Sequence, residues 1–119
     1  MEMSKVYFTN LRTSIGTSQL VMLKRLIRAA GIETIDFERK MTAIKIHFGE
    51  PGNLTYLRPN YAKAVADVIK ELGGIPFLTD CNTLYPGRRK NALEHIESAY
   101  ENGYSPFSTG CHVIIGDGL

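Results

Sequence analysis

The side chains most able to do chemistry stand just after apolar segments of the chain. His47 and Glu50 follow one such segment. Asp80 follows the next, and Asp117 follows the last. Imidazole and carboxylate groups often act as general acids and bases, so we keep all four as catalytic candidates. They also suit a divalent metal, but no pair has a diagnostic spacing, and we assign no metal site.

Basic side chains near these candidates could hold an anion. The predicted anion-binding residues are Lys45, Arg58, Arg88 and Arg89. Arg88 and Arg89 stand at the expected start of a helix, where positive charge is unfavourable because that end is already positive. A bound anion would explain their place, and so would an ordinary run of solvated charges.

The segment Ala43–Phe48 predicts a strand that carries two basic side chains. Side chains alternate along a strand, so Lys45 and His47 share one face and the apolar residues share the other. Either this face lines a ligand cleft, or the strand lies at an edge with one face in solvent. The following loop, 49–58, is longer than the roughly two to six residues typical of α/β units, and long loops are often functional.

Apolar periodicity and turn residues predict alternating strands and helices. Strands are expected at 6–11, 43–48, 75–79 and 113–115, and helices at 19–31, 59–72 and 89–101. This order predicts an α/β fold with a mainly parallel sheet of about four strands and about three covering helices. The fold would be Rossmann-like, either three-layered or partial. On the last helix we expect Leu93, Ile96 and Tyr100 to face the core and His95 to face solvent.

Ligands of open α/β sheets bind at the carboxyl ends of the strands. If the strands are parallel neighbours, the four candidates from His47 to Asp117 should meet along one rim. Cys81 stands beside Asp80 and is either a nucleophile near a base or an inert buried thiol.

Length and composition exclude several classes of protein. A chain of 119 residues fits one domain, here 1–119. The net charge of +2, without aromatics interleaved among the basic residues, argues against nucleic acid as a partner. No apolar run approaches the roughly 18 residues of a membrane span, and the N-terminus has no apolar signal-peptide core. We therefore expect a cytoplasmic protein whose two cysteines, Cys81 and Cys111, are free thiols.

Four blocks of sequence carry a family resemblance. They are IKIHFGEPGN, YLRPNY, FLTDCNTLYPGRRKNA and AYENGYSPFSTGCHVIIGDGL. In this order they resemble the N-terminal portion of the domain-of-unknown-function family three-six-two, often called uncharacterised iron–sulfur centre proteins. The resemblance implies an α/β domain followed by a ferredoxin-like segment whose cysteines bind [4Fe–4S] clusters. That segment is absent here, so we expect no cofactor on this chain alone and carry over neither Cys81 nor Cys111 as a cluster ligand.

Three functions remain open after these observations. The first is the N-terminal α/β domain of an iron–sulfur redox protein, truncated at Leu119, where a further helix would be expected to follow the last strand. The second is an enzyme domain for a phosphate- or carboxylate-bearing metabolite, in which Lys45, Arg88 and Arg89 hold the anion and His47 or Glu50 moves a proton. The third is a non-catalytic docking scaffold. The expected partners are the missing C-terminal domain or another chain, a small anionic ligand, and a second copy of the chain.

Overall fold

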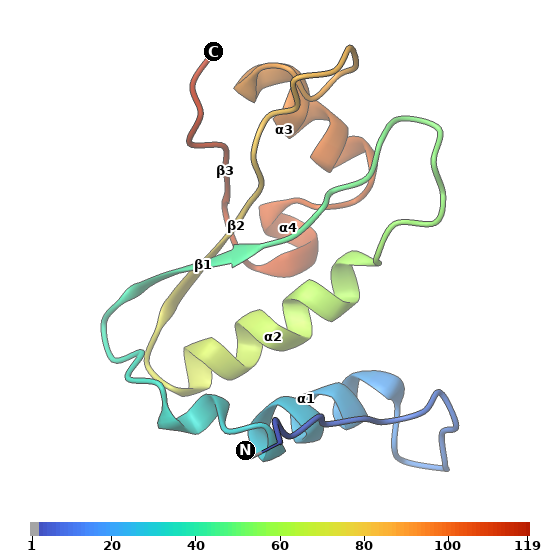
Figure 1. Cartoon of the computed structure of the whole chain (residues 1–119), viewed down its shortest axis with the longest axis vertical. Helices are drawn as coiled ribbons and strands as arrows, with labels where there is room; N and C mark the ends of the chain where they lie inside the picture. Colours follow the sequence, from blue (N-terminus) through green and yellow to red (C-terminus); the bar gives the residue numbers. More distant parts are fainter. Residues whose placement is uncertain (1–2) are drawn as a thin grey trace. The chain divides into compact units, whose positions relative to one another are not determined.

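The computed structural model describes residues 3–119 and divides into two compact units, Met1–Asp36 and Phe37–Leu119 (Figure 1). The single domain predicted from chain length stays a prediction. The elements in chain order are α1 (Gln19–Ala29), the 3-10 helix η1 (Ile32–Thr34), β1 (Met41–Lys45), α2 (Pro59–Glu71), β2 (Ile75–Thr79), α3 (Ala92–Glu101), α4 (Pro106–Thr109) and β3 (Val113–Ile114). Among the described residues, no helix is both long and apolar enough to cross a membrane.

The first unit confirms the predicted helix but not the strand before it. Ser18 caps α1, because its hydroxyl oxygen accepts a hydrogen bond from the Val21 backbone N–H at 3.3 Å. The strand predicted at 6–11 is wrong, since this segment has no regular structure and Val6 and Phe8 are 89% and 82% exposed. Aromatic and β-branched residues favour a strand only where neighbouring strands offer a packing surface, and residues 3–36 form no sheet.

The second unit is built on a parallel sheet with strand order β1-β2-β3. Ile44 pairs with Leu78, which pairs with Val113. The predicted α/β class and parallel pairing are confirmed, with three strands in place of about four. β2 has its predicted bounds, whereas β1 begins and ends earlier than predicted, although the Ile46 backbone N–H still donates to the Thr79 carbonyl at 3.0 Å.

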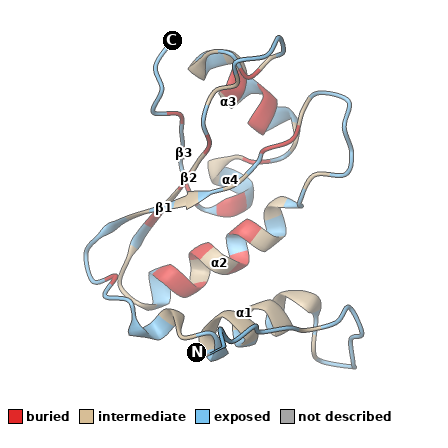
Figure 2. Cartoon of the chain, in the orientation of Figure 1, coloured by how far each residue is buried: buried red, intermediate tan, exposed pale blue. Residues whose placement is uncertain are grey.

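One face of this sheet carries the core of the second unit. Figure 2 shows the buried residues gathered along the strands, α2 and α3. The buried cluster comprises Phe48, Ala62, Ala66, Leu78, Ala99, Tyr104, Cys111, Val113 and Ile115. On the other face, Met41, Ile75 and Ile114 are 81%, 54% and 47% exposed. Within Phe37–Leu119 the helices therefore cover one face, which is the partial arrangement rather than three layers.

Two features of the later helices differ from the prediction. α3 begins at Ala92 rather than near 89, because the Asn91 side chain caps it by accepting from the Glu94 backbone N–H at 3.0 Å. Its buried face carries His95, Ser98 and Ala99. The short helix α4 was not predicted, although Ser105 before Pro106 is a capping signal.

The predicted inner face of α3 is wrong at two of its three positions. Leu93 and Tyr100 are 63% and 48% exposed, while His95 is fully buried. The stripe Ala92, His95, Ile96 and Ala99 has the same spacing of three and four residues but smaller or polar side chains. The positions of the largest apolar side chains therefore predicted the wrong buried face for this helix.

Candidate functional site

The neighbouring ends of β1 and β2 bring Lys45 beside Asp80. Lys45 pairs in register with Thr79, and Asp80 is the next residue. The Lys45 Nζ lies 2.9 Å from Asp80 Oδ1, with the lysine side chain 67% exposed and the aspartate side chain 5% exposed. Burial alone would raise the pKa of Asp80, but the hydrogen bond and charge of Lys45 hold it below its ordinary value. The basic face of edge strand β1 thus meets solvent and one buried carboxylate.

Arg89 joins Asp80 to Glu50. Its side chain is only 3% exposed, its Nη1 lies 3.3 Å from Asp80 Oδ2, and its Nε donates to Glu50 Oε1 at 2.7 Å. Burial alone would lower the pKa of Arg89, but the Glu50 hydrogen bond raises it. The Arg89 hydrogen bond in turn lowers the pKa of Glu50. Both carboxylates are therefore held ionised.

Tyr85 completes the surroundings of the Arg89 guanidinium. The guanidinium carbon lies 6.0 Å from the Tyr85 ring centre, and Arg89 Nη2 donates to the Tyr85 hydroxyl at 2.5 Å. That hydroxyl donates to Glu50 Oε1 at 3.1 Å. We call Lys45, Glu50, Asp80, Tyr85 and Arg89 the rim network. Its two positive and two negative side chains balance, so it carries no net charge.

His95 borders the rim network and is fully buried, contrary to the prediction that it is solvated. Its Nδ1 lies 2.9 Å from the side-chain oxygen of Asn82, which can only accept, so Nδ1 carries the proton. Nε2 lies 3.6 Å from Asp80 Oδ2 and has no hydrogen-bond partner among the described residues. Burial lowers the pKa of His95, although Asp80 opposes this shift. The ring is therefore neutral at pH 7.

Asp117 and His47 lie at the margins of this arrangement. The Asp117 carboxylate accepts a hydrogen bond from the backbone N–H of Asn82, so the end of β3 is linked to the end of β2. The His47 ring makes a local contact, its Nδ1 accepting from the Gly49 backbone N–H at 3.0 Å. Glu50 and Asp80 thus meet through Arg89, and Asp117 is linked to them through Asn82 and His95. Their catalytic roles stay predictions.

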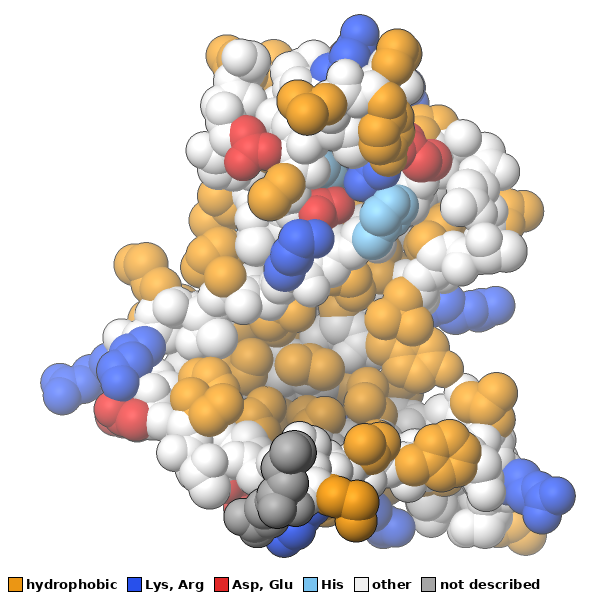
Figure 3. Space-filling view, in the orientation of Figure 1, with side chains coloured by type: hydrophobic (Ala, Val, Ile, Leu, Met, Phe, Trp, Pro, Cys, Tyr) orange, Lys and Arg blue, Asp and Glu red, His pale blue; other side chains and the backbone are white. Residues whose placement is uncertain are grey.

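Arg88 points away from the rim network although it is adjacent to Arg89. Its guanidinium lies 2.7 Å from Glu101 and 3.2 Å from Glu97, and its side chain is 38% exposed. Both arginines precede α3, and their partners are the chain's own carboxylates. No external anion is needed to explain their position, and anion binding by them stays a prediction. Figure 3 shows basic, acidic and histidine side chains gathered on one face in the upper part of the view.

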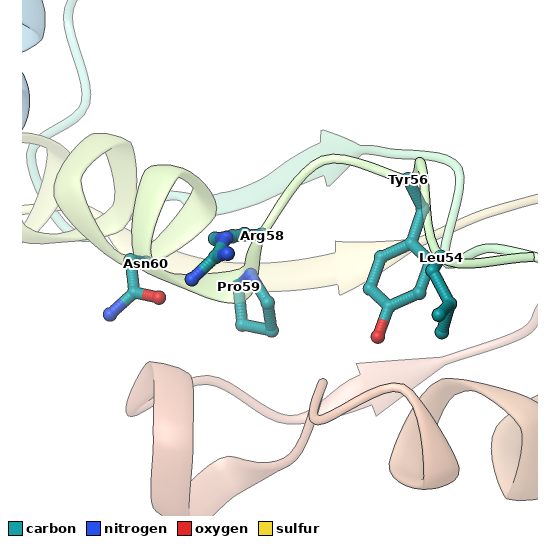
Figure 4. A pocket seen from close by; sticks show the side chains of 5 residues that line it. All are labelled: Leu54, Tyr56, Arg58, Pro59 and Asn60. Atoms are coloured by element: carbon teal, nitrogen blue, oxygen red, sulfur yellow. The ribbon is translucent and has the colours of Figure 1, made fainter.

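Arg58 lies apart from the rim network, beside a hollow at the start of α2. Figure 4 shows Arg58 and Asn60 at the helix start and Tyr56 with Leu54 on the preceding loop. These residues and Pro59 line a hollow of about 370 Å³. Arg58 is exposed, and its side chain does not cap the helix. Arg58 therefore does not share a site with Lys45, Arg88 and Arg89, and its predicted anion binding stays a prediction.

The two cysteines do not fit an iron–sulfur cluster. A [4Fe–4S] cluster needs four thiolate ligands, and the chain has two cysteines, both free. Cys81 is exposed and follows the end of β2, whereas Cys111 is buried and precedes the start of β3. Parallel strands place these positions at opposite ends of the sheet, and burial raises the pKa of the Cys111 thiol. Within residues 3–119, no group of three or more His, Cys, Asp and Glu side chains is arranged to hold a metal.

Comparison with known proteins places the chain in a family but does not give it an activity. Searches of curated proteins and of solved structures found no match. Residues 42–119 match the family described as "Domain of unknown function (DUF362)". This range is more than half of the chain and contains β1 from its second residue, then α2, β2, α3, α4, β3 and the whole rim network. The chain therefore belongs to the DUF362 family.

Proposed function

We propose that the unit Phe37–Leu119 binds a small ligand bearing a carboxylate or phosphate group at the carboxyl ends of its strands. The observation that carries the proposal is the Lys45 ammonium, which is 67% exposed yet fixed by a 2.9 Å bond to Asp80. An ammonium has three N–H donors, and this bond uses one of them. The remaining donors face solvent at the place where parallel α/β sheets bind ligands.

The chain would serve as the α/β domain of an iron–sulfur redox protein of the kind that its sequence resembles. A cluster would supply one-electron transfer, and its ligands would have to come from outside the two cysteines of this chain. The contribution of this unit is then to bind and orient an anionic ligand. Lys45, Asp80 and Arg89 would take no part in electron transfer.

The electrostatics of the rim network favour binding over proton transfer. Arg89 lowers the pKa of Glu50, and a carboxylate held ionised by a guanidinium is a weak base. His95 has an unprotonated Nε2, but the residue is fully buried and cannot reach a ligand in solvent. If the unit is an enzyme, the proton carrier is therefore exposed His47 rather than Glu50.

The exposed apolar face of the sheet favours a second candidate, docking of another protein chain. Met41 and Ile75 are 81% and 54% exposed on strands whose opposite face is packed. A sheet face of this kind is normally covered in a parallel α/β protein. Docking would require no chemistry at the rim.

A thermal-shift comparison tests the first proposal. Acetate, succinate and inorganic phosphate are added to the full chain at constant ionic strength, and Tm is compared between wild type, K45Q and K63Q. Lys63 is a matched control, since its ammonium also lies 2.9 Å from an aspartate, Asp67, but both residues belong to α2 rather than to the strand ends. We expect at least one anion to raise the Tm of wild type and K63Q alike and to have a smaller effect on K45Q. If none of the anions raises the Tm of wild type, the proposal fails.

A further inference from the structure

We infer that Arg89 and Tyr85 form a carboxylate-binding site that the chain fills with its own Glu50. A free monocarboxylate would bind there when the Glu50 side chain is removed. The inference rests on the proposed function, since it concerns the same rim, and it names a carboxylate as the group that Arg89 and Tyr85 bind. It rests on the contacts of a single oxygen, and its test compares the acetate response of E50A with that of wild type, so its failure can be told apart from failure of the proposed function.

Three donors converge on Glu50 Oε1. Arg89 Nε donates to it at 2.7 Å, Arg89 Nη2 lies 2.5 Å from it, and the Tyr85 hydroxyl donates to it at 3.1 Å. The two arginine nitrogens form one side of the guanidinium fork, which matches a carboxylate. These donors are complementary to any carboxylate that takes the place of the Glu50 carboxylate, whether or not it is attached to the chain.

Burial indicates that the Glu50 carboxylate separates Arg89 from solvent. The Glu50 side chain is 30% exposed, whereas that of Arg89 is 3% exposed. Shortening Glu50 to alanine would open a hollow of about the size of acetate in front of the guanidinium. The backbone at residue 49 is firmly held, because the Asn102 amide donates to the Phe48 carbonyl at 2.9 Å and a Cβ at Gly49 would lie 2.7 Å from Asn102 and Tyr56. The hollow should therefore keep its shape.

Charge balance selects a monocarboxylate. With Glu50 in place, the positive charges of Lys45 and Arg89 balance the negative charges of Asp80 and Glu50. A monocarboxylate in the position of Glu50 restores this balance. A doubly charged phosphate would leave one excess negative charge beside buried Asp80, and excess charge is costly where water is scarce.

The test is rescue of Glu50→Ala by acetate. Tm of E50A, wild type and E97A is measured in sodium acetate, sodium phosphate and sodium chloride at matched ionic strength. Glu97 is the matched control, because it also pairs with an arginine, Arg88, but its side chain is 65% exposed. When the acetate concentration is about ten times its dissociation constant from E50A, we expect acetate to raise the Tm of E50A by roughly 3–6 °C beyond its effect on wild type and E97A.

Each outcome decides the inference. An acetate effect on E50A no larger than on wild type and E97A overturns it, and so does a phosphate effect as large as that of acetate. If E50A is unfolded in chloride, circular dichroism in acetate replaces Tm: refolding supports the site, and absence of refolding overturns it. E50Q keeps the hollow filled and should show no extra acetate effect. Failure of the proposed function is a separate result, namely no response of wild type to any anion.

Discussion

Arg88 and Arg89 are neighbours in sequence and both pair with two carboxylates, yet they belong to different regions of the molecule. Arg88 lies on the outer side of α3 with Glu97 and Glu101, and all three side chains are at least 38% exposed. Arg89 lies in the rim network with its side chain 3% exposed. The same chemical pairing is thus solvated in one region and buried in the other.

The difference teaches that burial, rather than the number of ion pairs, sets what each arginine contributes. An exposed pair gains little, since water and salt screen it. In the buried region Asp80 keeps only 5% of its side-chain surface, so without Arg89 this buried carboxylate would be paired only with the exposed ammonium of Lys45. The buried region is therefore where substitutions should have large effects.

The largest effect is expected from Arg89→Met, which removes the charge but keeps much of the side-chain volume. Asp80 and Glu50 would lose their shared partner, and breaking a buried pair on one side costs about 3–5 kcal/mol. Urea unfolding of R89M should show a loss of this size relative to wild type. R89K serves as the control for charge, and it should recover part of the loss because an ammonium cannot bind both carboxylates as a fork does. A loss in R89M below about 1 kcal/mol would contradict the buried network.

A smaller loss of stability is expected when glycines of the loop that carries Glu50 are changed to alanine, and it should differ between Gly49 and Gly52. Gly49 has φ of +87°, and a Cβ there would lie 2.7 Å from Asn102 Nδ2 and the Tyr56 ring. G49A should lower the free energy of unfolding by about 2–3 kcal/mol, from backbone strain and a disturbed hydrogen bond. Gly52 has φ of +84° but no atom within 4 Å of its Cβ position, so G52A should cost about 1 kcal/mol. Equal losses in urea unfolding would show that Gly49 is not crowded.

The pH dependence of stability should also follow the buried region. The folded-state pKa of His95 lies below its ordinary value of 6.5, chiefly because of burial, with Asp80 and Glu50 opposing the shift and Arg89 supporting it. The unfolded chain therefore takes up this proton first, and stability falls as pH falls below about 6.5. The pKa values of Glu50 and Asp80 are also lowered, so their contribution is present above about 4.5 and is lost as pH falls further.

His95→Gln tests the upper step of this pH profile. The variant should lose most of the decline in unfolding free energy between about pH 7 and pH 5.5, since glutamine does not titrate. The matched variant H112Q removes an exposed histidine and serves as the control for the loss of one imidazole. An unchanged slope in H95Q would mean that His95 does not titrate as its burial requires.

Local rules predicted much of the fold. Three short-range signals coincide with helix ends in the structure. Ser18 caps α1, Pro59 is the first residue of α2, and Gly73 follows the end of α2. The parallel sheet followed from the alternation of elements. The strand at 6–11 failed because a strand depends on neighbours that its own residues do not specify.

The sequence predicted which edge of the sheet carries the candidate site, but not which side chains contact one another there. The strand-end rule brought Glu50, Asp80 and Asp117 to one edge. It could not tell which of two adjacent arginines turns inward, because the side chains are identical and stand next to each other in the same loop before α3. His95 was missed because its helix face is marked by alanines rather than by large apolar side chains.

The smallest effect is expected from Arg88→Met. All partners of Arg88 are exposed, so its removal should leave the urea midpoint nearly unchanged at about 0.15 M salt. Raising salt to about 1 M should remove any remaining difference from wild type, because the charges are then screened within a few ångström. The loss in R89M should persist at the same salt, since salt does not enter the buried network. If R88M and R89M had equal midpoints at both salt concentrations, burial would not be what separates the two arginines.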